Sequence, residues 1–219
     1  MTARVTRARA PGHGLLDGRA AAIACVLLAV ALALSVAAAR ADNFPGDEPL
    51  ARAINGVGDW YEPIANLTNA APELLAGAAA LAAAAVAWRR GHPDAVLVCV
   101  LVVLARWPLT VLKPLIDRPR PAGLELREVA TSESFPSGHV LTIALGFGLW
   151  VLLASELVPA RHVSAVRVGA AVVVLLAGVA RVWAGVHWPS DAIGSVLWAA
   201  VVLAAVAALR PLLRRAVGG

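Results

Sequence analysis

Long apolar stretches constrain this chain more than any other feature of its sequence. Crossing the hydrocarbon layer of a bilayer takes about 20 mostly apolar residues in helical form, because backbone polar groups find no water there. Six stretches approach or reach this length, at residues 20–39, 71–88, 95–112, 140–158, 168–182 and 193–209. The composition agrees, since 60% of the 219 residues are hydrophobic and only 15% are charged. The sequence therefore predicts an all-α, polytopic membrane protein with six transmembrane helices.

The distribution of basic residues predicts how these helices are oriented. Short connections rich in Lys and Arg stay in the cytoplasm. Basic residues gather before the first stretch, in the second-to-third and fourth-to-fifth connections, and after the last stretch: Arg4, Arg7, Arg9, Arg19, Arg89, Arg90, Arg161, Arg167, Arg210, Arg214 and Arg215. We therefore expect both termini in the cytoplasm. The net charge of +5 needs no nucleic-acid partner, because these clusters account for it.

The chain is expected to form one membrane domain, residues 20–209, between a cytoplasmic segment, residues 1–19, and a tail, residues 210–219. An amphiphilic outer segment at residues 41–70 carries Trp60 and Tyr61, which suit the headgroup layer. The first apolar stretch also resembles a secretory signal with an Ala-x-Ala cleavage site. Its apolar run is longer than a typical signal core, so we expect a retained anchor, with a cleaved signal as the alternative.

Small residues are frequent in the predicted helices, and we assign them no function beyond close helix packing. Cys25 and Cys99 both fall inside predicted helices, where cysteine behaves as a small apolar residue. They indicate neither a disulfide nor a metal site.

Three polar phrases on the predicted outer side need another explanation. They are "KPLIDRPRP" at residues 113–121, "PSGH" at 136–139 and "RVWAGVHWPSD" at 181–191. Taken singly, each has a structural interpretation: Lys113 could reach toward the headgroups, Ser137 could cap a helix, and Asp191 could favour a helix start. Their chemistry is complementary, however, and all three belong to one side of the membrane.

The phrases contain the groups that bind and attack a phosphate. Positive charge neutralises phosphoryl oxygens, and the backbone N–H groups at a helix start bind anions. The candidates for this binding are Lys113, Arg120, Ser137, Gly138 and Arg181. The imidazoles of His139 and His187 can act as nucleophile, acid or base, and Asp191 can hold one ring nitrogen of His187.

These phrases resemble the signatures of the type 2 phosphatidic acid phosphatase (PAP2) superfamily, which read Lys-x6-Arg-Pro, Pro-Ser-Gly-His and Ser-Arg-x5-His-x3-Asp. The matching positions are Lys113, Arg120, Pro121, the segment 136–139, Arg181, His187 and Asp191. Ala180 stands where the third signature has serine, so we expect one hydroxyl contact to phosphate to be missing.

The doublet "RPRP" leaves a choice between Arg118 and Arg120 for the first signature. Family spacing selects Arg120, and helical phase agrees weakly, because seven residues return a helix to nearly the same face. Pro119 and Pro121 argue against a continuous helix there. Lys113 is the only lysine in the chain and falls on the one signature position that takes lysine.

The resemblance implies a PAP2-type helical bundle in the cell membrane with its active site facing the extracytoplasmic side. It implies that His187 attacks phosphorus and forms a phospho-histidine, that Asp191 orients His187, and that His139 protonates the departing lipid oxygen. The other five candidates would bind the phosphate, with no metal and no cofactor. The substrate would be a lipid phosphate, such as phosphatidic acid, phosphatidylglycerophosphate or undecaprenyl pyrophosphate. The sequence leaves the choice among them, and the oligomeric state, open.

Two alternatives are a catalytically silent relative that binds or moves phospholipids and a vanadate-dependent haloperoxidase, which six spans disfavour because those enzymes are soluble. Arg106, inside the third predicted helix, has both a functional and a structural interpretation, since charges inside membranes mark sites but those near helix ends reach water.

Overall fold

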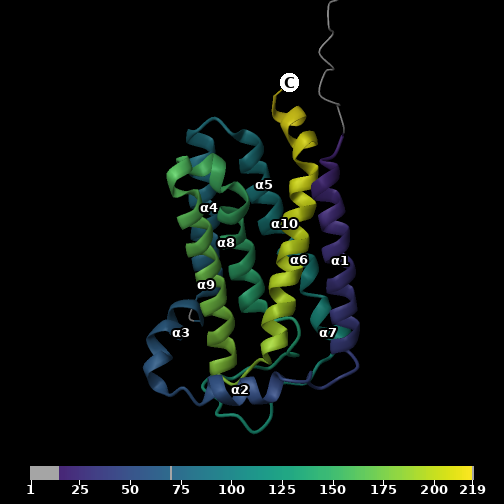
Figure 1. Cartoon of the computed structure of the whole chain (residues 1–219), viewed down its shortest axis with the longest axis vertical. Coiled ribbons are helices and arrows are strands. Elements are labelled where there is room, and N and C mark those ends of the chain that lie inside the picture. The colour runs from purple at the N-terminus through teal and green to yellow at the C-terminus, as the bar shows by residue number, and fades with distance from the viewer. Residues whose placement is uncertain (1–14, 70, 219) are drawn as a thin grey trace, which may run out of the picture.

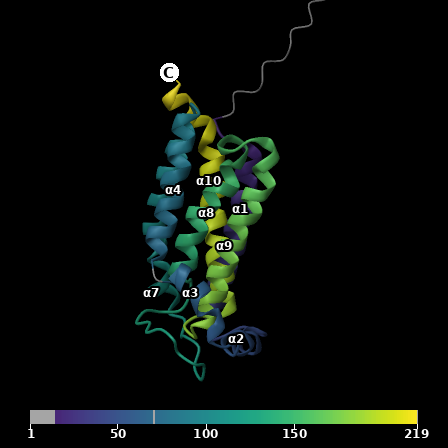
Figure 2. The ribbon, with the colours of Figure 1, turned by 90° about the vertical axis from the view of Figure 1, so that its left-hand side faces the viewer.

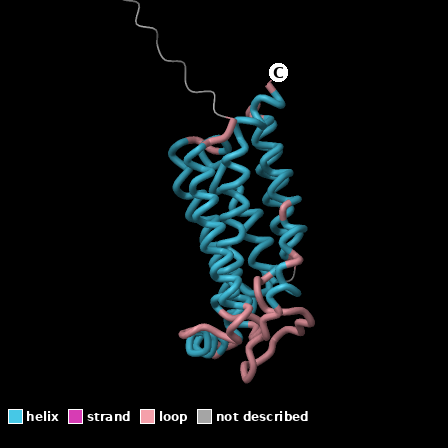
Figure 3. Tube along the Cα trace, turned by 90° about the vertical axis from the view of Figure 1, so that its right-hand side faces the viewer, coloured by secondary structure: helices cyan, strands magenta, loops and turns pink. Residues whose placement is uncertain are grey.

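The computed structural model describes residues 15–69 and 71–218, and this part of the chain contains helices and loops but no strand. The long helices lie side by side along one axis (Figure 1), and the longest loops gather at one end (Figure 3). The all-α prediction is confirmed. The helices are α1 (Gly18–Ala38), α2 (Asp47–Asn55), η1 (Asp59–Tyr61), α3 (Glu62–Asn69), α4 (Pro72–Arg89), α5 (Pro93–Leu104), α6 (Arg106–Leu109), α7 (Leu112–Ile116), α8 (Gly138–Leu157), η2 (Ala160–His162), α9 (Val163–Trp183) and α10 (Pro189–Val217).

Helix α8 is the centre of the bundle. Its apolar stretch is 67% buried, whereas that of α1 is 11% buried and that of α9, taken with η2, is 22% buried. It packs against α4, α9 and α10, while α1 packs on the outside of α10 (Figures 1 and 2). The outer helices expose Leu and Val side chains, which suits a hydrocarbon surrounding as apolar as these side chains.

Small residues bring α4 and α8 close together. A Cβ added at Gly146 of α8 would lie 2.8 Å from Ala76 of α4, closer than real side chains approach. Glycine is therefore required at position 146, which is the packing role expected of the small residues in membrane helices.

The third apolar stretch, predicted at residues 95–112, lies within one candidate membrane span, but its helix is divided into three pieces. The helix is interrupted between α5 and α6 at Ala105, and again between α6 and α7 at residues 110–111. Pro108 and Pro114 stand in this region, and a proline inside a helix removes a backbone hydrogen bond. The three pieces still pass together as one candidate span, Pro93–Ile116.

The last piece, α7, stops before the arginine doublet. Asp117 follows it in the left-handed region, with φ at 50°, and the following residues form a loop. Arg120 therefore does not share a helix with Lys113, and the argument from helical phase for choosing Arg120 is wrong.

Five helices of the described chain are long and apolar enough to cross a membrane, so this is a multi-pass membrane protein by length and composition. Helix α4 becomes part of a sixth span only if it is joined to the preceding helical segment Asp59–Asn69, at an angle of 56°. The number six therefore stays a prediction.

The basic segments lie at one end of the bundle, together with the C-terminus and the start of α1 (Figure 1). At this end Arg210 of α10 donates to Asp94 of α5 at 2.7 Å and to Glu156 of α8 at 2.5 Å, which ties three helices together. Residues 1–14, with Arg4, Arg7 and Arg9, lie outside the described residues. Which end faces the cytoplasm stays a prediction.

Helix α2 lies across the opposite end of the bundle, against α9 and α10 (Figure 1). It is amphipathic: Asp47, Ala51 and Asn55 are buried at spacings of four residues, while the other side is exposed. Trp60, further along the outer segment, is 69% exposed and suits a headgroup layer. Tyr61 does not, because it is buried and donates its hydroxyl to the carbonyl of Leu176 at 3.1 Å.

Candidate active site

The turn between α9 and α10 places His187 beside Asp191. Trp188 is the N-cap of α10 and Pro189 its first residue, so Asp191 lies in the first turn. Its Oδ2 lies 3.3 Å from Nδ1 of His187 and also accepts the backbone N–H of Trp188 at 2.8 Å. The pair therefore spans the helix start rather than a full helical turn, and both side chains are buried. Because Asp191 contacts Nδ1, Nε2 is the ring nitrogen of His187 that can face a substrate.

The surroundings keep His187 uncharged at neutral pH. Burial lowers the pKa of His187 to about 4, and the charges of Arg120 and Arg181 act in the same direction, against the opposing effect of Asp191. A neutral imidazole has a lone pair on one nitrogen, which is what a nucleophile needs.

Asp191 is itself held by Arg118. The Nη1 of Arg118 lies 2.6 Å from Oδ1 of Asp191 and 2.8 Å from Oγ of Ser190. Its Nη2 lies 2.9 Å from Oδ2 of Asp47 at the start of α2, and Arg118 and Asp191 are completely buried. Burial alone would raise the pKa of Asp47, but hydrogen bonds from Ser190, Phe44 and Arg118 outweigh it and leave this pKa lowered.

Sequence reasoning missed this network. It treated Arg118 only as the rejected alternative to Arg120, and the structure gives the two arginines different positions. No motif points to Asp47, which lies 143 residues before its partner Ser190. The one signal in the sequence was the doublet itself, which offers two arginines. In the structure Arg118 contacts Asp191 and Arg120 contacts His187.

Arg120 lies directly at the histidine. Its Nη1 is 3.3 Å from Nε2 of His187. The rest of the guanidinium is fixed by backbone carbonyls: Nε donates to Ser132 at 2.6 Å, Nη2 donates to Glu133 at 3.2 Å, and Nη1 also donates to Val186. A guanidinium fixed in this way can donate to a phosphate oxygen next to the attacking nitrogen.

Lys113 lies on α7, at the end of the third span. Its Nζ donates to the carbonyl of Glu133 and lies 3.4 Å from Oγ of Ser132. It interacts electrostatically with Arg120, Arg181 and Asp191. Two cationic side chains, Lys113 and Arg120, thus meet at the same two residues of the loop between α7 and α8, 132 and 133.

Ser137 is the N-cap residue of α8, but its side chain does not cap the helix. Its Oγ is buried and has no hydrogen-bond partner among the described residues. Its carbonyl accepts a hydrogen bond from Ser195 of α10 at 3.0 Å, which joins the two helix starts. An unpartnered buried hydroxyl beside free N–H groups of a helix start is an anion-binding arrangement.

Arg181 lies in the last turn of α9 and contacts the loop between α7 and α8. It forms a two-point ion pair with Glu128, Nη2 to Oε1 at 3.0 Å and Nη1 to Oε2. Its Nε is buried without a partner in the described part of the chain. Burial alone would raise the pKa of Glu128, but the hydrogen bonds and charge of Arg181, together with the charges of His139 and His187, outweigh it and leave this pKa lowered. The carboxylate of Glu128 therefore pairs with the guanidinium of Arg181, which was expected to bind phosphate.

His139 follows Gly138 in the first turn of α8 and is partly buried. It interacts electrostatically with Arg181 and Glu128. The eight predicted residues thus come from α7, the loop after it, the start of α8, the last turn of α9, and the turn that leads into α10, and the structure brings them to one end of the bundle. Ala180, one turn before Ala184, is completely buried in an apolar cluster with Tyr61 and Trp183.

No group of three or more His, Cys, Asp or Glu residues within the described ranges is arranged to hold a metal ion. Cys25 and Cys99 are free thiols, exposed and buried respectively.

Fold and site together define a helical membrane protein with a buried His–Asp pair beside cationic side chains and a helix start suited to anions. The family model of the PAP2 superfamily matches residues 94–215, more than half of the chain, and the protein belongs to this superfamily. The chain is also similar to the crystal structure of the first transmembrane PAP2 type phosphatidylglycerolphosphate phosphatase from Bacillus subtilis, with a TM-score of 0.65 and 24% sequence identity. That likeness covers 84% of this chain and 94% of the other and shows a shared fold. A comparison with curated proteins finds no match.

Proposed function

We propose that this protein is a lipid phosphate phosphatase that hydrolyses a phosphomonoester or pyrophosphate headgroup at the extracytoplasmic leaflet. The observation that carries the proposal is the position of His187, held at Nδ1 by Asp191 and facing Arg120 at 3.3 Å from Nε2. A neutral, oriented imidazole next to a donor for phosphate oxygens is the arrangement for attack on phosphorus. Membership of the superfamily and the phosphatase with the same fold support it.

The first step transfers the phosphoryl group to His187. The lone pair on Nε2 forms a bond to phosphorus, the bond from phosphorus to the lipid oxygen breaks, and His139 gives that oxygen a proton. Asp191 holds Nδ1–H and stabilises the positive charge that develops on the ring. Lys113, Arg120, Arg181 and the start of α8 neutralise the phosphoryl oxygens.

The second step releases phosphate. A water oxygen attacks phosphorus, the N–P bond breaks, and His139 takes a proton from the water. His187 returns to its neutral form. The cationic side chains supply the charge stabilisation throughout, so we expect hydrolysis without a metal ion or cofactor.

The substrate phosphate would take the place of Glu128. The carboxylate offers Arg181 two oxygens, as a phosphate does, and its side chain is 33% exposed, so it can move aside toward solvent. Ser137 Oγ and Arg181 Nε would then gain the partners that they lack.

The position of the site supports a lipid substrate and the extracytoplasmic leaflet. The site lies at the end of the bundle away from the basic segments, which the positive-inside rule assigns to the cytoplasm. A cavity of about 140 Å³, lined by Lys113, Pro136 and Gly138, also reaches the apolar side chains of Leu109 and Leu141. A headgroup can enter such a site while its tail stays among apolar groups.

The test is phosphate release by the purified protein from phosphatidic acid, phosphatidylglycerophosphate and undecaprenyl pyrophosphate, with chelator present. Turnover that vanadate inhibits competitively, and that His187→Ala abolishes, is expected. Activity lost with chelator and restored by a divalent ion would contradict the metal-free mechanism. Lipid binding or transfer without phosphate release would favour the catalytically silent alternative.

A further inference from the structure

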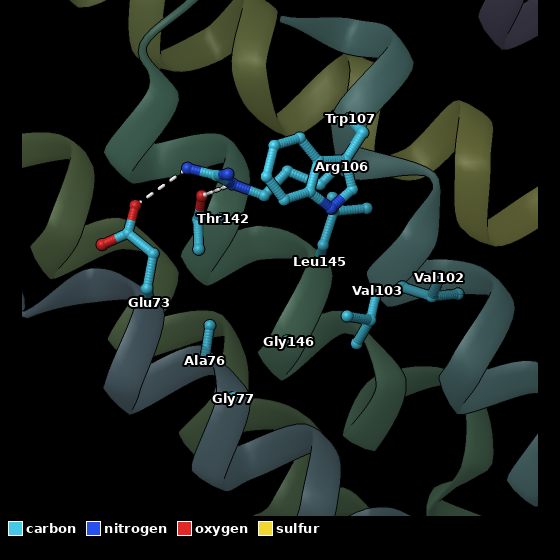
Figure 4. A pocket seen from close by; sticks show the side chains of 10 residues that line it. All are labelled: Glu73, Ala76, Gly77, Val102, Val103, Arg106, Trp107, Thr142, Leu145 and Gly146. Carbon is cyan, nitrogen blue, oxygen red and sulfur yellow. Dashed lines mark hydrogen bonds and ion pairs between the residues drawn. The ribbon is translucent and has the colours of Figure 1, made fainter.

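Arg106 is a charged residue that the proposed reaction leaves unused. It begins α6, within the third span, and the apolar side chains of Val103 and Leu145 line the cavity beside it. Its Nε lies 2.7 Å from Oγ1 of Thr142 on α8, and its Nη2 lies 2.8 Å from Oε1 of Glu73 on α4 (Figure 4). A charge in such a place is costly and normally serves a site.

The remaining nitrogen of this guanidinium is available to a ligand. Nη1 has no hydrogen-bond partner among the described residues, although Nε and Nη2 are both bonded. The side chain of Arg106 is 29% exposed and that of Glu73 is 61% exposed. Glu73 is the more exposed partner of this pair, so its side chain can move aside when another anion binds Arg106.

Arg106 also joins two cavities. One, of about 140 Å³, contains Lys113 and Gly138 of the phosphate site together with Arg106. The other, of about 190 Å³, contains Arg106, Glu73 and Trp107, and the rest of its lining is mostly small or apolar: Ala76, Gly77, Val102, Val103, Thr142, Leu145 and Gly146 (Figure 4). Arg106 thus lines both the cavity at the phosphate site and an apolar groove between α4, α5 and α8.

We propose that Arg106 forms a second anion subsite, which binds the second phosphate of a lipid substrate that carries two. The terminal phosphate would lie on the groups around His187, the second phosphate on Arg106, and the tail in the groove beyond Trp107. This inference rests on the proposed function and narrows its substrate class. A lipid with a single phosphate places only uncharged atoms beside Arg106, so it leaves this cation paired with Glu73.

Two kinds of lipid share this chemistry, a pyrophosphate and a lipid with a phosphodiester before its terminal phosphate. Matched pairs distinguish them: farnesyl pyrophosphate with farnesyl phosphate, and phosphatidylglycerophosphate with phosphatidic acid of the same acyl chains. The measurement is kcat/KM of the purified full-length protein in nanodiscs for all four lipids.

Arg106→Gln is expected to lower kcat/KM about ten- to a hundredfold on at least one two-phosphate lipid, through loss of a charge-assisted hydrogen bond. The matching single-phosphate lipid should change less than about threefold. Arg106→Lys, which keeps the charge, should recover part of the loss. Glu73→Gln should raise the ratio of two-phosphate to single-phosphate kcat/KM, because it removes the anion that competes for Arg106; its electrostatic effect on His139 acts on both substrates and cancels in this ratio.

Arg167→Gln is the matched control, an exposed arginine of α9 at the opposite end whose Nε donates to the carbonyl of Val151. It should change none of the four activities. Equal losses on both members of each pair in Arg106→Gln would overturn the subsite, because they indicate a structural or general catalytic role. Unchanged activity on all four lipids would overturn it as well.

Binding separates this inference from the proposed function. If the parent protein releases no phosphate from any lipid, the proposed function fails, and the subsite is tested with farnesyl methylenediphosphonate and farnesyl phosphonate, which are not hydrolysed. Binding of the diphosphonate weakened about tenfold by Arg106→Gln, with unchanged phosphonate binding, would support the subsite. Equal binding of the diphosphonate by parent and variant would overturn it.

Discussion

Arg118 and Asp191 form a completely buried ion pair, with 2.6 Å between Nη1 and Oδ1. The other carboxylate oxygen of Asp191, Oδ2, faces His187. The same guanidinium reaches Asp47 of α2 at 2.9 Å. One arginine therefore holds both the orienting carboxylate and the helix that covers this end of the bundle.

Arg118→Gln should impair both stability and turnover. Removing one partner of a buried ion pair leaves the other charges uncompensated, which typically costs about 3–5 kcal/mol. Asp191 would also lose an anchor, so kcat should fall about tenfold or more while KM changes little. Thermal unfolding and lipid phosphatase assays measure the two effects. Arg52→Gln, which removes an exposed pair with Glu48, is the control and should be silent. An Arg118→Gln protein as stable and active as the parent would contradict this role.

The two histidines should respond differently to the leaving group. A lipid alkoxide needs a proton as it departs, whereas p-nitrophenolate leaves without one. His139→Ala should therefore keep appreciable turnover, or an initial burst, on p-nitrophenyl phosphate and lose most activity on a lipid phosphate. His187→Ala removes the attacking atom and should be inactive on both. Equal losses for both variants on both substrates, in proteins that insert and fold normally, would reject the two roles.

The pH dependence should reflect the lowered pKa of His187, about 4. The neutral ring is the reactive form, so this group should not limit kcat/KM from about pH 7 to about pH 5, and activity should fall as it gains a proton below that range. Unfolding raises the pKa toward about 6.5, so the unfolded chain binds more protons between these values and the free energy of unfolding decreases as pH falls through them. An NMR titration of labelled histidines measures this pKa. A midpoint for His187 near its ordinary value would contradict the prediction.

Glu128→Gln should tighten the binding of phosphate-like anions. The substitution removes the carboxylate that occupies Arg181, so vanadate or phosphate meets a free guanidinium, and the inhibition constant should fall about tenfold. Competitive inhibition assays measure it. Glu125→Gln is the matched control, because Glu125 pairs with Arg127 at 2.6 Å on the exposed side of the same loop. Unchanged or weaker inhibition of the Glu128→Gln protein would show that the carboxylate does not compete with the anion.

The site should face the extracytoplasmic side. Val129, 89% exposed on the loop beside Glu128, provides a position for a reactive thiol in a background without Cys25 and Cys99. Val129→Cys should react with a membrane-impermeant thiol reagent in intact cells, whereas Ala160→Cys in η2, at the other end of the bundle, should react only after lysis. The reverse pattern would invert the orientation.

The amino-acid sequence by itself determined the all-helical membrane class and the candidate residues of the site. Both depend on patterns within short segments: apolar runs that require helices in lipid, and three polar phrases whose residues act together. The interruptions of the third span could have been expected from Pro108 and Pro114, but only the structure shows that α7 ends at Ile116 and that Arg120 lies in a loop.

The tertiary structure alone decided how the side chains are supported. Asp47 meets Ser190 across 143 positions of sequence, Arg118 joins both to Asp191, and Glu128 occupies Arg181 across 53 positions. Only the structure shows that Arg106 contacts Thr142 and Glu73 and lines two cavities. Such contacts arise because burial forces each charge to find a partner nearby in space, and that partner can come from any part of the chain.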